Sequence, residues 1–286
     1  MNVQSLSRIN KRTECALLVL LIVSSTLWGQ STPRLAFDVA SIKQSPPDED
    51  GGGYTFERGG RTVIKKFTLK NLIMVAWHVQ EFQVTAPAAW MDSTRYDIEA
   101  KAGGNPSNDQ SRLMLQSLLL ERFHLVVFRE SKKLPIFVLR RAGALKAGLI
   151  PDKNPQCTPT DKDFPVDVPG ERPFCQITFR LVKSADNGTS MLVQGTTSIS
   201  AIERLLSTIV ERQVTDQTNL SGVFDLKLEF RPDDFSGRAA PIPGATNSTA
   251  PSIFTAVQEQ LGLKLVQTKG PVEVLVIDHA EEPTPN

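Results

Sequence analysis

A five-element pattern that occurs twice along the chain constrains the fold more than any other feature. Each copy has an apolar-periodic helix, a strand, a second helix and two further strands. The first copy begins at Thr68, which we expect to cap its first helix, and the second begins with a helix from Ile199 to Val210, where Ser200 and Glu203 have capping-box spacing. We predict an α+β fold of two similar halves, with short helices packed on largely antiparallel sheets.

Two alternating strands show the correspondence between the halves best. Residues 96–101 and 223–230 both alternate apolar with charged side chains, as a strand with one buried face does. Short strings also match: 95–98 (Arg-Tyr-Asp-Ile) resembles 223–226 (Val-Phe-Asp-Leu), and 134–136 resembles 270–272. These matches favour an internal duplication over two α+β halves that are similar by chance.

The last two strands of each half lie close together in sequence. Residues 124–129 and 134–140 are separated by a short polar link, Ser131-Lys132-Lys133, and we expect a hairpin there. Residues 263–266 and 272–277 form the equivalent pair at the end of the chain. Connections this short cannot hold a parallel crossover, so we predict antiparallel pairing within each pair.

Changes in composition along the chain suggest domain limits. Proline-rich and polar stretches separate the two periodic halves, and the last residues contain two prolines. We predict a signal peptide at 1–31, a first α+β half at 32–147, a proline-rich connector at 148–175, a second half at 176–280 and a tail at 281–286.

The N-terminal segment has the three parts of a secretory signal. Arg8, Lys11 and Arg12 precede an unbroken apolar run at 16–23, and small residues at 29 and 31 provide a cleavage site. We therefore expect a periplasmic or secreted protein without a stable membrane span after cleavage. The alternative is an uncleaved anchor, which we disfavour because the run is short of the ~20 residues that a spanning helix needs.

Two cysteines, Cys157 and Cys175, remain after cleavage of a signal peptide that contains the third. Disulfides form in exported proteins because the compartment is oxidising, so we predict a bond between them. The alternative is a pair of free thiols.

The composition excludes several classes of function. With 32 basic and 31 acidic residues, the formal charge of +1 gives no electrostatic basis for nucleic-acid binding. The three histidines are not spaced with other metal ligands, and the motifs of nucleophile elbows, zinc-peptidase helices and phosphate loops are absent from the sequence. We predict no catalytic residue, no metal site and no cofactor.

Three residues are the candidates for contact with a ligand. Trp90 precedes a strand and could stack on a ligand or anchor a buried corner. Asp97 and Glu99 lie two apart on one strand and must point to the same face, as a catalytic carboxylate pair would. Charged residues that alternate with apolar ones are also typical of a solvated sheet face, which is the interpretation we favour.

Seven segments in order, from about residue 35 to the C-terminus, resemble the markers of a known family. It is a large paralogous family of secreted proteins from soil acidobacteria, defined by a domain of unknown function that is sometimes fused to membrane metallopeptidase sensors of the BlaR/MecR type. The resemblance implies export and a shared domain, and it implies no catalytic residue; the peptidase helix and the multiple spans of those sensors are absent from this sequence. The segments are 37–43, 88–101, 118–123, 134–139, 222–226, 254–264 and 271–278.

These observations predict a non-catalytic module that binds a small ligand or a protein partner in the cell envelope. The alternative is a hydrolase of envelope or extracellular polymers that uses a carboxylate pair about 5–9.5 Å apart, with a raised pKa on one member. A third possibility is a structural or assembly module.

Overall fold

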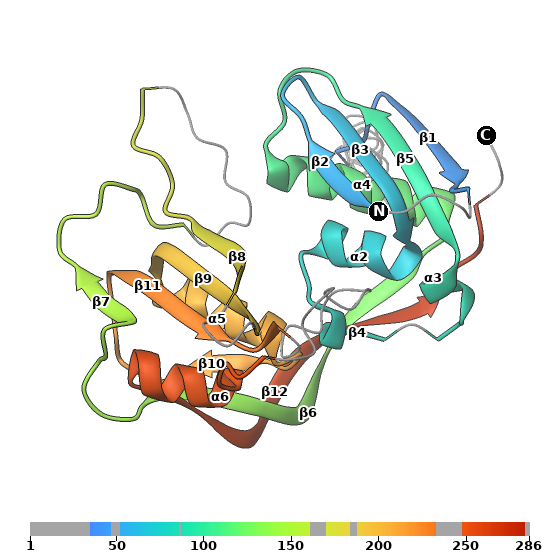
Figure 1. Cartoon of the computed structure of the whole chain (residues 1–286). Helices are drawn as coiled ribbons and strands as arrows, with labels where there is room; N and C mark the ends of the chain where they lie inside the picture. Colours follow the sequence, from blue (N-terminus) through green and yellow to red (C-terminus); the bar gives the residue numbers. More distant parts are fainter. Residues whose placement is uncertain are drawn as a thin grey trace, which may run out of the picture.

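The computed structural model has two lobes joined by a pair of long strands (Figure 1). It describes residues 35–46, 52–85, 87–160, 170–183, 188–232 and 248–283. The predicted signal peptide, part of the predicted connector and the end of the tail lie outside these residues. Mixed helices and largely antiparallel sheets confirm the α+β class.

The first lobe is a four-stranded antiparallel sheet with helices packed on it. Its strand order is β1-β5-β3-β2. The strands are β1 (Val39–Gln44), β2 (Gly53–Phe56), β3 (Arg61–Thr68) and β5 (Arg95–Lys101). The helices are α2 (Leu69–Trp77), the 3-10 turn η1 (Glu81–Gln83), α3 (Trp90–Ser93) and α4 (Asn108–Arg122).

The second lobe repeats this plan. Its strand order is β7-β11-β9-β8, again with antiparallel neighbours, so each strand has a counterpart at the same place in the first lobe. This agreement is what an internal duplication predicts. The elements are β7 (Leu149–Asp152), β8 (Ile177–Lys183), β9 (Thr189–Ser198), α5 (Ile199–Ile209), β11 (Val223–Phe230), α6 (Ile253–Ala256) and the π-helical turn η4 (Val257–Leu261).

Two long strands form the connection between the lobes. Strands β6 (Val126–Arg141) and β12 (Leu263–His279) pair antiparallel along their whole length. The short strands β10 (Val214–Asp216) and β4 (Val84–Thr85) pair parallel to their outer edges, giving the order β10-β6-β12-β4. The prediction of two hairpins is therefore wrong: each presumed hairpin is one continuous strand.

The polar link that suggested a turn is the solvent-exposed middle of a strand. A tight hairpin needs residues that accept positive φ, and Ser131, Lys132 and Lys133 are poor choices for that. Midway along the pair, Gly270 lies opposite Leu134 and packs against Ile136, whose Cδ1 would clash with a Cβ at position 270. The glycine serves this close packing and not a turn.

Both strands of the connection contribute to both hydrophobic cores. Leu275 and Ile277 of β12 are buried in the core of the first lobe, while Phe137 and Leu139 of β6 are buried in that of the second. The predicted domain limits stay predictions. Each predicted half nevertheless contributes a strand to the core of the other lobe, β6 to the second core and β12 to the first.

The helix starts follow local capping chemistry. Thr68 caps α2 as expected, since its Oγ1 accepts a hydrogen bond from the Asn71 amide at 3.2 Å. The cap of α5 is Ser198, which accepts from the Ala201 amide, so the expected capping box at Ser200 is wrong by two residues. Both first helices therefore begin directly at the end of a strand.

We predict that Tyr96→Phe leaves stability at neutral pH unchanged or raises it by up to about 1 kcal/mol. The Tyr96 hydroxyl is buried and has no hydrogen-bond partner among the described residues, whereas the ring packs edge-on against Phe123 at 5.1 Å between centroids. Phe224 occupies the matching position of the second lobe. Urea denaturation of both forms provides the measurement.

The same variant should change the response to high pH. Burial, together with the charge of Glu282, raises the pKa of Tyr96 to about 12. The unfolded chain loses the phenol proton near its usual pKa of about 10, so the wild type loses stability as pH rises from about 10 to about 12. Tyr96→Phe should lack this component, and Tyr54→Phe, at the half-buried tyrosine, is the control. Identical pH profiles for wild type and Tyr96→Phe would contradict the assignment.

Candidate functional site: a pocket between the lobes

A pocket of about 950 Å³ lies where the end of α2 faces the second lobe. The first lobe contributes the segment that follows α2, and the second contributes α5, β9, β8 and the residues before β8. Eight of the lining residues have uncharged amide or hydroxyl side chains. The lining is His78, Val79, Gln80, Gln83, Thr160, Cys175, Gln176, Ile177, Phe179, Thr197, Ala201, Glu203, Arg204, Leu205, Ser207, Thr208 and Gln213.

Gln80 joins the two lobes at this pocket. Helix α2 ends at His78, whose backbone is left-handed (φ 53°), and the chain then turns toward the second lobe. The Gln80 amide nitrogen donates to the Arg204 carbonyl at 3.3 Å and to the Thr208 hydroxyl at 3.1 Å. Its Oε1 is buried without a partner in the described part of the chain. A buried acceptor left in this way is costly, so it is a natural contact for a ligand donor.

The polar side chains of α5 are held by bonds within the second lobe. The Ser207 hydroxyl donates to the Glu203 carbonyl at 2.8 Å and accepts from the Val214 amide at 2.9 Å. The Thr208 hydroxyl donates to the Arg204 carbonyl at 3.0 Å. These bonds fix the wall of the pocket before any ligand is present.

Glu203 is the only carboxylate among the described lining residues. Burial, and then the charge of Asp216, raise its pKa, and these effects outweigh the hydrogen bond from the Asp216 amide and the charge of Arg204. A carboxyl group in this position takes up a proton more readily than an exposed one.

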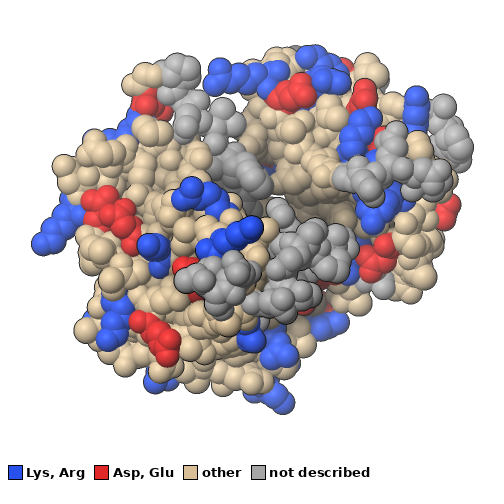
Figure 2. All heavy atoms as spheres, in the orientation of Figure 1, with Lys and Arg blue, Asp and Glu red and all other residues tan. Residues whose placement is uncertain are grey.

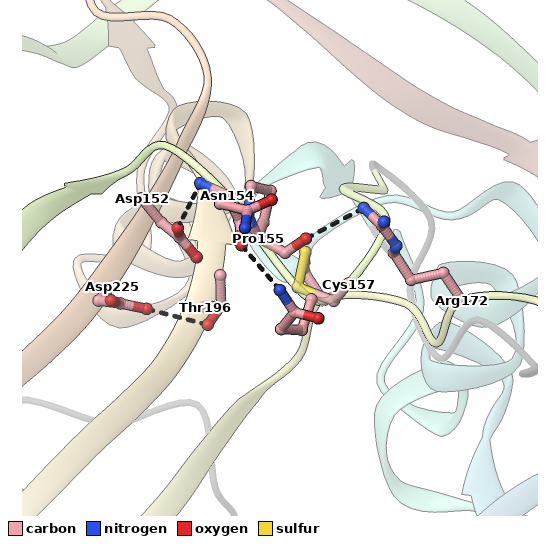
Figure 3. The surroundings of a disulfide bond; sticks show 9 residues. Asp152, Asn154, Pro155, Cys157, Arg172, Thr196 and Asp225 are labelled. Atoms are coloured by element: carbon pink, nitrogen blue, oxygen red, sulfur yellow. Dashed lines mark hydrogen bonds between the residues drawn. A yellow bond between two sulfur atoms is a disulfide. The ribbon is translucent and has the colours of Figure 1, made fainter.

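The disulfide supports the wall of the pocket on the side of β8. Cys157 and Cys175 are bonded, which confirms the prediction (Figure 3). Thr158 and Phe174 form a β-bridge beside it, and the Arg172 guanidinium donates to the Pro155 carbonyl at 3.1 Å. Because Cys175 lines the pocket and lies just before β8, the bond fixes where that strand begins.

The three ligand contacts expected from sequence lie elsewhere, in the first lobe, and their role stays a prediction. Trp90 is the first residue of α3, half-buried against the core of the first lobe. Asp97 and Glu99 share one face of β5, as expected, on the sheet surface. The pocket lining includes none of the three.

Asp97 stabilises an irregularity in β3. Its carboxylate accepts from the Ser45 hydroxyl at 2.6 Å and from the Lys66 amide at 2.9 Å, and it lies 3.4 Å from the Lys65 ammonium. Lys66 has a positive φ of 58° where the register of β3 shifts. Burial raises the pKa of Asp97, but the hydrogen bonds and Lys65 outweigh it and the net pKa is lowered. This is the chemistry of a β-bulge held by a side chain.

Glu99 belongs to an exposed ion pair. Its carboxylate is 2.9 Å from the Lys65 ammonium, and that hydrogen bond and charge lower its pKa. The pKa of both carboxylates is therefore lowered, which gives no support to a general acid at this pair. Exposed ion pairs of this kind contribute little to stability.

Sequence reasoning assigned no residue of the pocket to ligand contact, although it named Cys175 as half of the disulfide. The residues come from segments that are more than a hundred positions apart, and none forms a known motif. A comparison of the two copies of the duplicated pattern could have pointed to one pocket residue, Glu203. When the two capped helices are aligned from their first residues, Ile73 of α2 corresponds to Glu203 of α5.

The chain belongs to the family described as protein of unknown function (DUF3738). The family model matches residues 70–280, which include the second lobe, the connecting strands and the part of the first lobe from α2 onward, while β1, β2 and β3 precede the match. No curated protein and no solved structure matches the chain. The resemblance noted from the sequence is thus confirmed at the level of a domain of unknown function.

Three further properties bear on the possible partners. Over the described residues, no helix is both long and apolar enough to cross a membrane, and no group of three or more His, Cys, Asp and Glu side chains could hold a metal ion. Figure 2 shows basic and acidic side chains interspersed over the face drawn, in agreement with the near-zero net charge.

We predict that Cys157→Ser/Cys175→Ser lowers the free energy of unfolding by about 3 kcal/mol, because the bond closes an 18-residue separation in the unfolded chain. Urea denaturation provides the measurement. Dithiothreitol should destabilise the wild type equally and leave the double variant unchanged. A double variant as stable as the wild type would show that the bond contributes nothing.

Proposed function

We propose that this is an exported binding protein that holds a small polar ligand in the pocket between its lobes. The observation that carries the proposal is the pocket itself: about 950 Å³, lined from both lobes by uncharged polar side chains together with a few apolar ones. Small-molecule sites are typically concave, with a few fixed polar groups among apolar ones and a volume in this range.

The chemistry of the lining favours binding over hydrolysis. A carboxylate mechanism for polymer hydrolysis needs two acidic groups, and the described lining provides Glu203 alone. The hydroxyl of Ser207 is engaged with backbone groups on both sides, since it donates to the Glu203 carbonyl and accepts from the Val214 amide. Amide and hydroxyl groups held in place by internal bonds are suited to non-covalent recognition.

A thermal-shift screen tests the proposal. Purified protein is mixed with sugars, short peptides and metal ions, and we expect at least one class of organic ligand to raise the melting temperature. Ala201→Phe places a large ring into the pocket lining and should abolish that shift. Ala142→Phe makes the same change at an exposed position outside the lining and should keep it. A shift that persists in Ala201→Phe, or a screen without any shift, would refute the proposal.

Export is the second part of the proposal, and it is supported by the charged, apolar and small-residue regions of the N-terminus. We expect the protein to be recovered outside the cytoplasm with a new N-terminus near residue 32. Replacing Leu18 and Leu21 by Arg should keep it inside with the N-terminus intact, whereas Leu→Arg at Leu6, outside the apolar run, should not. Cell fractionation with N-terminal sequencing provides the measurement, and a mature protein that begins at Met1 would contradict cleavage.

A further inference from the structure

We propose that the pocket recognises an uncharged, hydroxyl-rich ligand of the saccharide class, and that Glu203 accepts hydrogen bonds from its hydroxyl groups. This inference rests on the proposed function and specifies its ligand. Four observations support it: the exchange of a core residue for Glu203, the hydrogen-bonding groups left over in the wall, the balance of charge, and an aromatic ring at the rim.

The equivalent helices of the two lobes, α2 and α5, differ at the position that faces the pocket. Helices α2 and α5 each follow a strand directly and begin after a capping Thr or Ser. Their first, fourth and eighth residues are buried apolar residues in both lobes. The fifth residue differs: Ile73 is fully buried in the first core, while Glu203 lines the pocket in the second.

A half-buried carboxylate at a position that the scaffold can fill with isoleucine is unfavourable for stability, because burial penalises its charged form. The ninth residue changes in the same sense, from Trp77 to Ser207. At these two positions, both of which line the pocket, the second lobe has therefore given up apolar side chains. Ligand recognition gives a reason for that loss.

Several hydrogen-bond donors of the pocket wall are used within the protein. The amide hydrogens of Gln80 are both donated within the protein, and Gln213 donates to the Val214 carbonyl. The hydroxyls of Ser207 and Thr208 are donated to backbone carbonyls. The Gln80 Oε1 atom has no partner among the described residues, and the Glu203 carboxylate, which accepts from the Asp216 amide, has further lone pairs with which to accept. A complementary ligand therefore supplies hydrogen-bond donors, and adjacent hydroxyl groups do so.

The charge of the wall selects against charged ligands. Glu203 and Arg204 are neighbours in the lining, so one wall carries both signs and has no excess of either. An anion would meet the carboxylate and a cation the guanidinium, whereas an uncharged hydroxyl group can donate a hydrogen bond to the carboxylate.

An aromatic surface completes the match. Phe179 of β8 lines the pocket and is 45% exposed, and Ile177 lies beside it on the same face of the strand. A sugar ring has an apolar face of C–H groups, and burying that face against an aromatic ring is favourable. Donor hydroxyls combined with an apolar ring face are properties of saccharides.

Titration calorimetry tests the inference with ring compounds that differ in charge. Glucose, glucosamine and glucuronate carry net charges of zero, plus one and minus one, and neutral trisaccharides (cellotriose, maltotriose, N,N′,N″-triacetylchitotriose) extend the panel. We expect a neutral saccharide to bind most tightly. Glu203→Gln should weaken that binding by about tenfold or more, because a charge-assisted hydrogen bond is lost.

Stability separates recognition from a structural role. Removing the half-buried charge should leave Glu203→Gln at least as stable as the wild type, and Glu203→Ile, which copies Ile73, should fold and not bind. Glu121→Gln, at a residue exposed on α4, is the matched control and should bind as the wild type does. Binding by the wild type should also weaken at acid pH, and binding by Glu203→Gln should not.

The outcomes distinguish this inference from the proposed function. If glucosamine or glucuronate binds most tightly, or Glu203→Gln keeps its affinity, the saccharide assignment is wrong. If another class of compound binds and is blocked by Ala201→Phe, while no saccharide binds, the pocket is a binding site and only this inference fails. If nothing in either screen binds, both fail.

Discussion

The pairing of β6 with β12 is the interaction on which the rest of the structure depends. Each lobe has an incomplete core until this pair is formed, because Leu275 and Ile277 complete the first core and Phe137 and Leu139 the second. The pairing also sets the distance between the lobes, and so brings the segment after α2 opposite α5. The pocket between the lobes therefore follows from the hydrogen-bonded pairing of β6 with β12.

Two copies of one plan allow the lobes to serve different purposes. The first keeps apolar residues along α2 and uses Asp97 to hold a bulge in its sheet. The second has Glu203 and Ser207 where α2 has Ile73 and Trp77, and Gln80 from the first lobe bonds to α5 beside them. In a duplicated fold, each lobe is a reference for the other. Where equivalent residues differ, the counterpart shows that the fold does not require that side chain.

Sequence patterns predicted the local elements well, because period and capping depend on neighbours in the chain. The alternation at 223–230 is a strand, Thr68 caps its helix, and the two cysteines are bonded. The hairpins failed because a polar stretch between apolar ones describes either a turn or the exposed middle of one strand, and only the distant partner decides. The pocket residues were not predicted for the same reason, because Gln80 and Glu203 are brought together by tertiary structure alone. Asp97 and Glu99 were chosen instead because they are an acidic pair close together in sequence.

The strand exchange also bears on the order of events during synthesis, and on the export that we propose. The first lobe needs side chains from β12, so its interior stays open until nearly the whole polypeptide has emerged. A chain that cannot close early remains extended, and an extended chain is the form that threads through a narrow translocation channel. Delayed closure is thus built into the connectivity, and it would hold for any sequence that adopts this arrangement of strands.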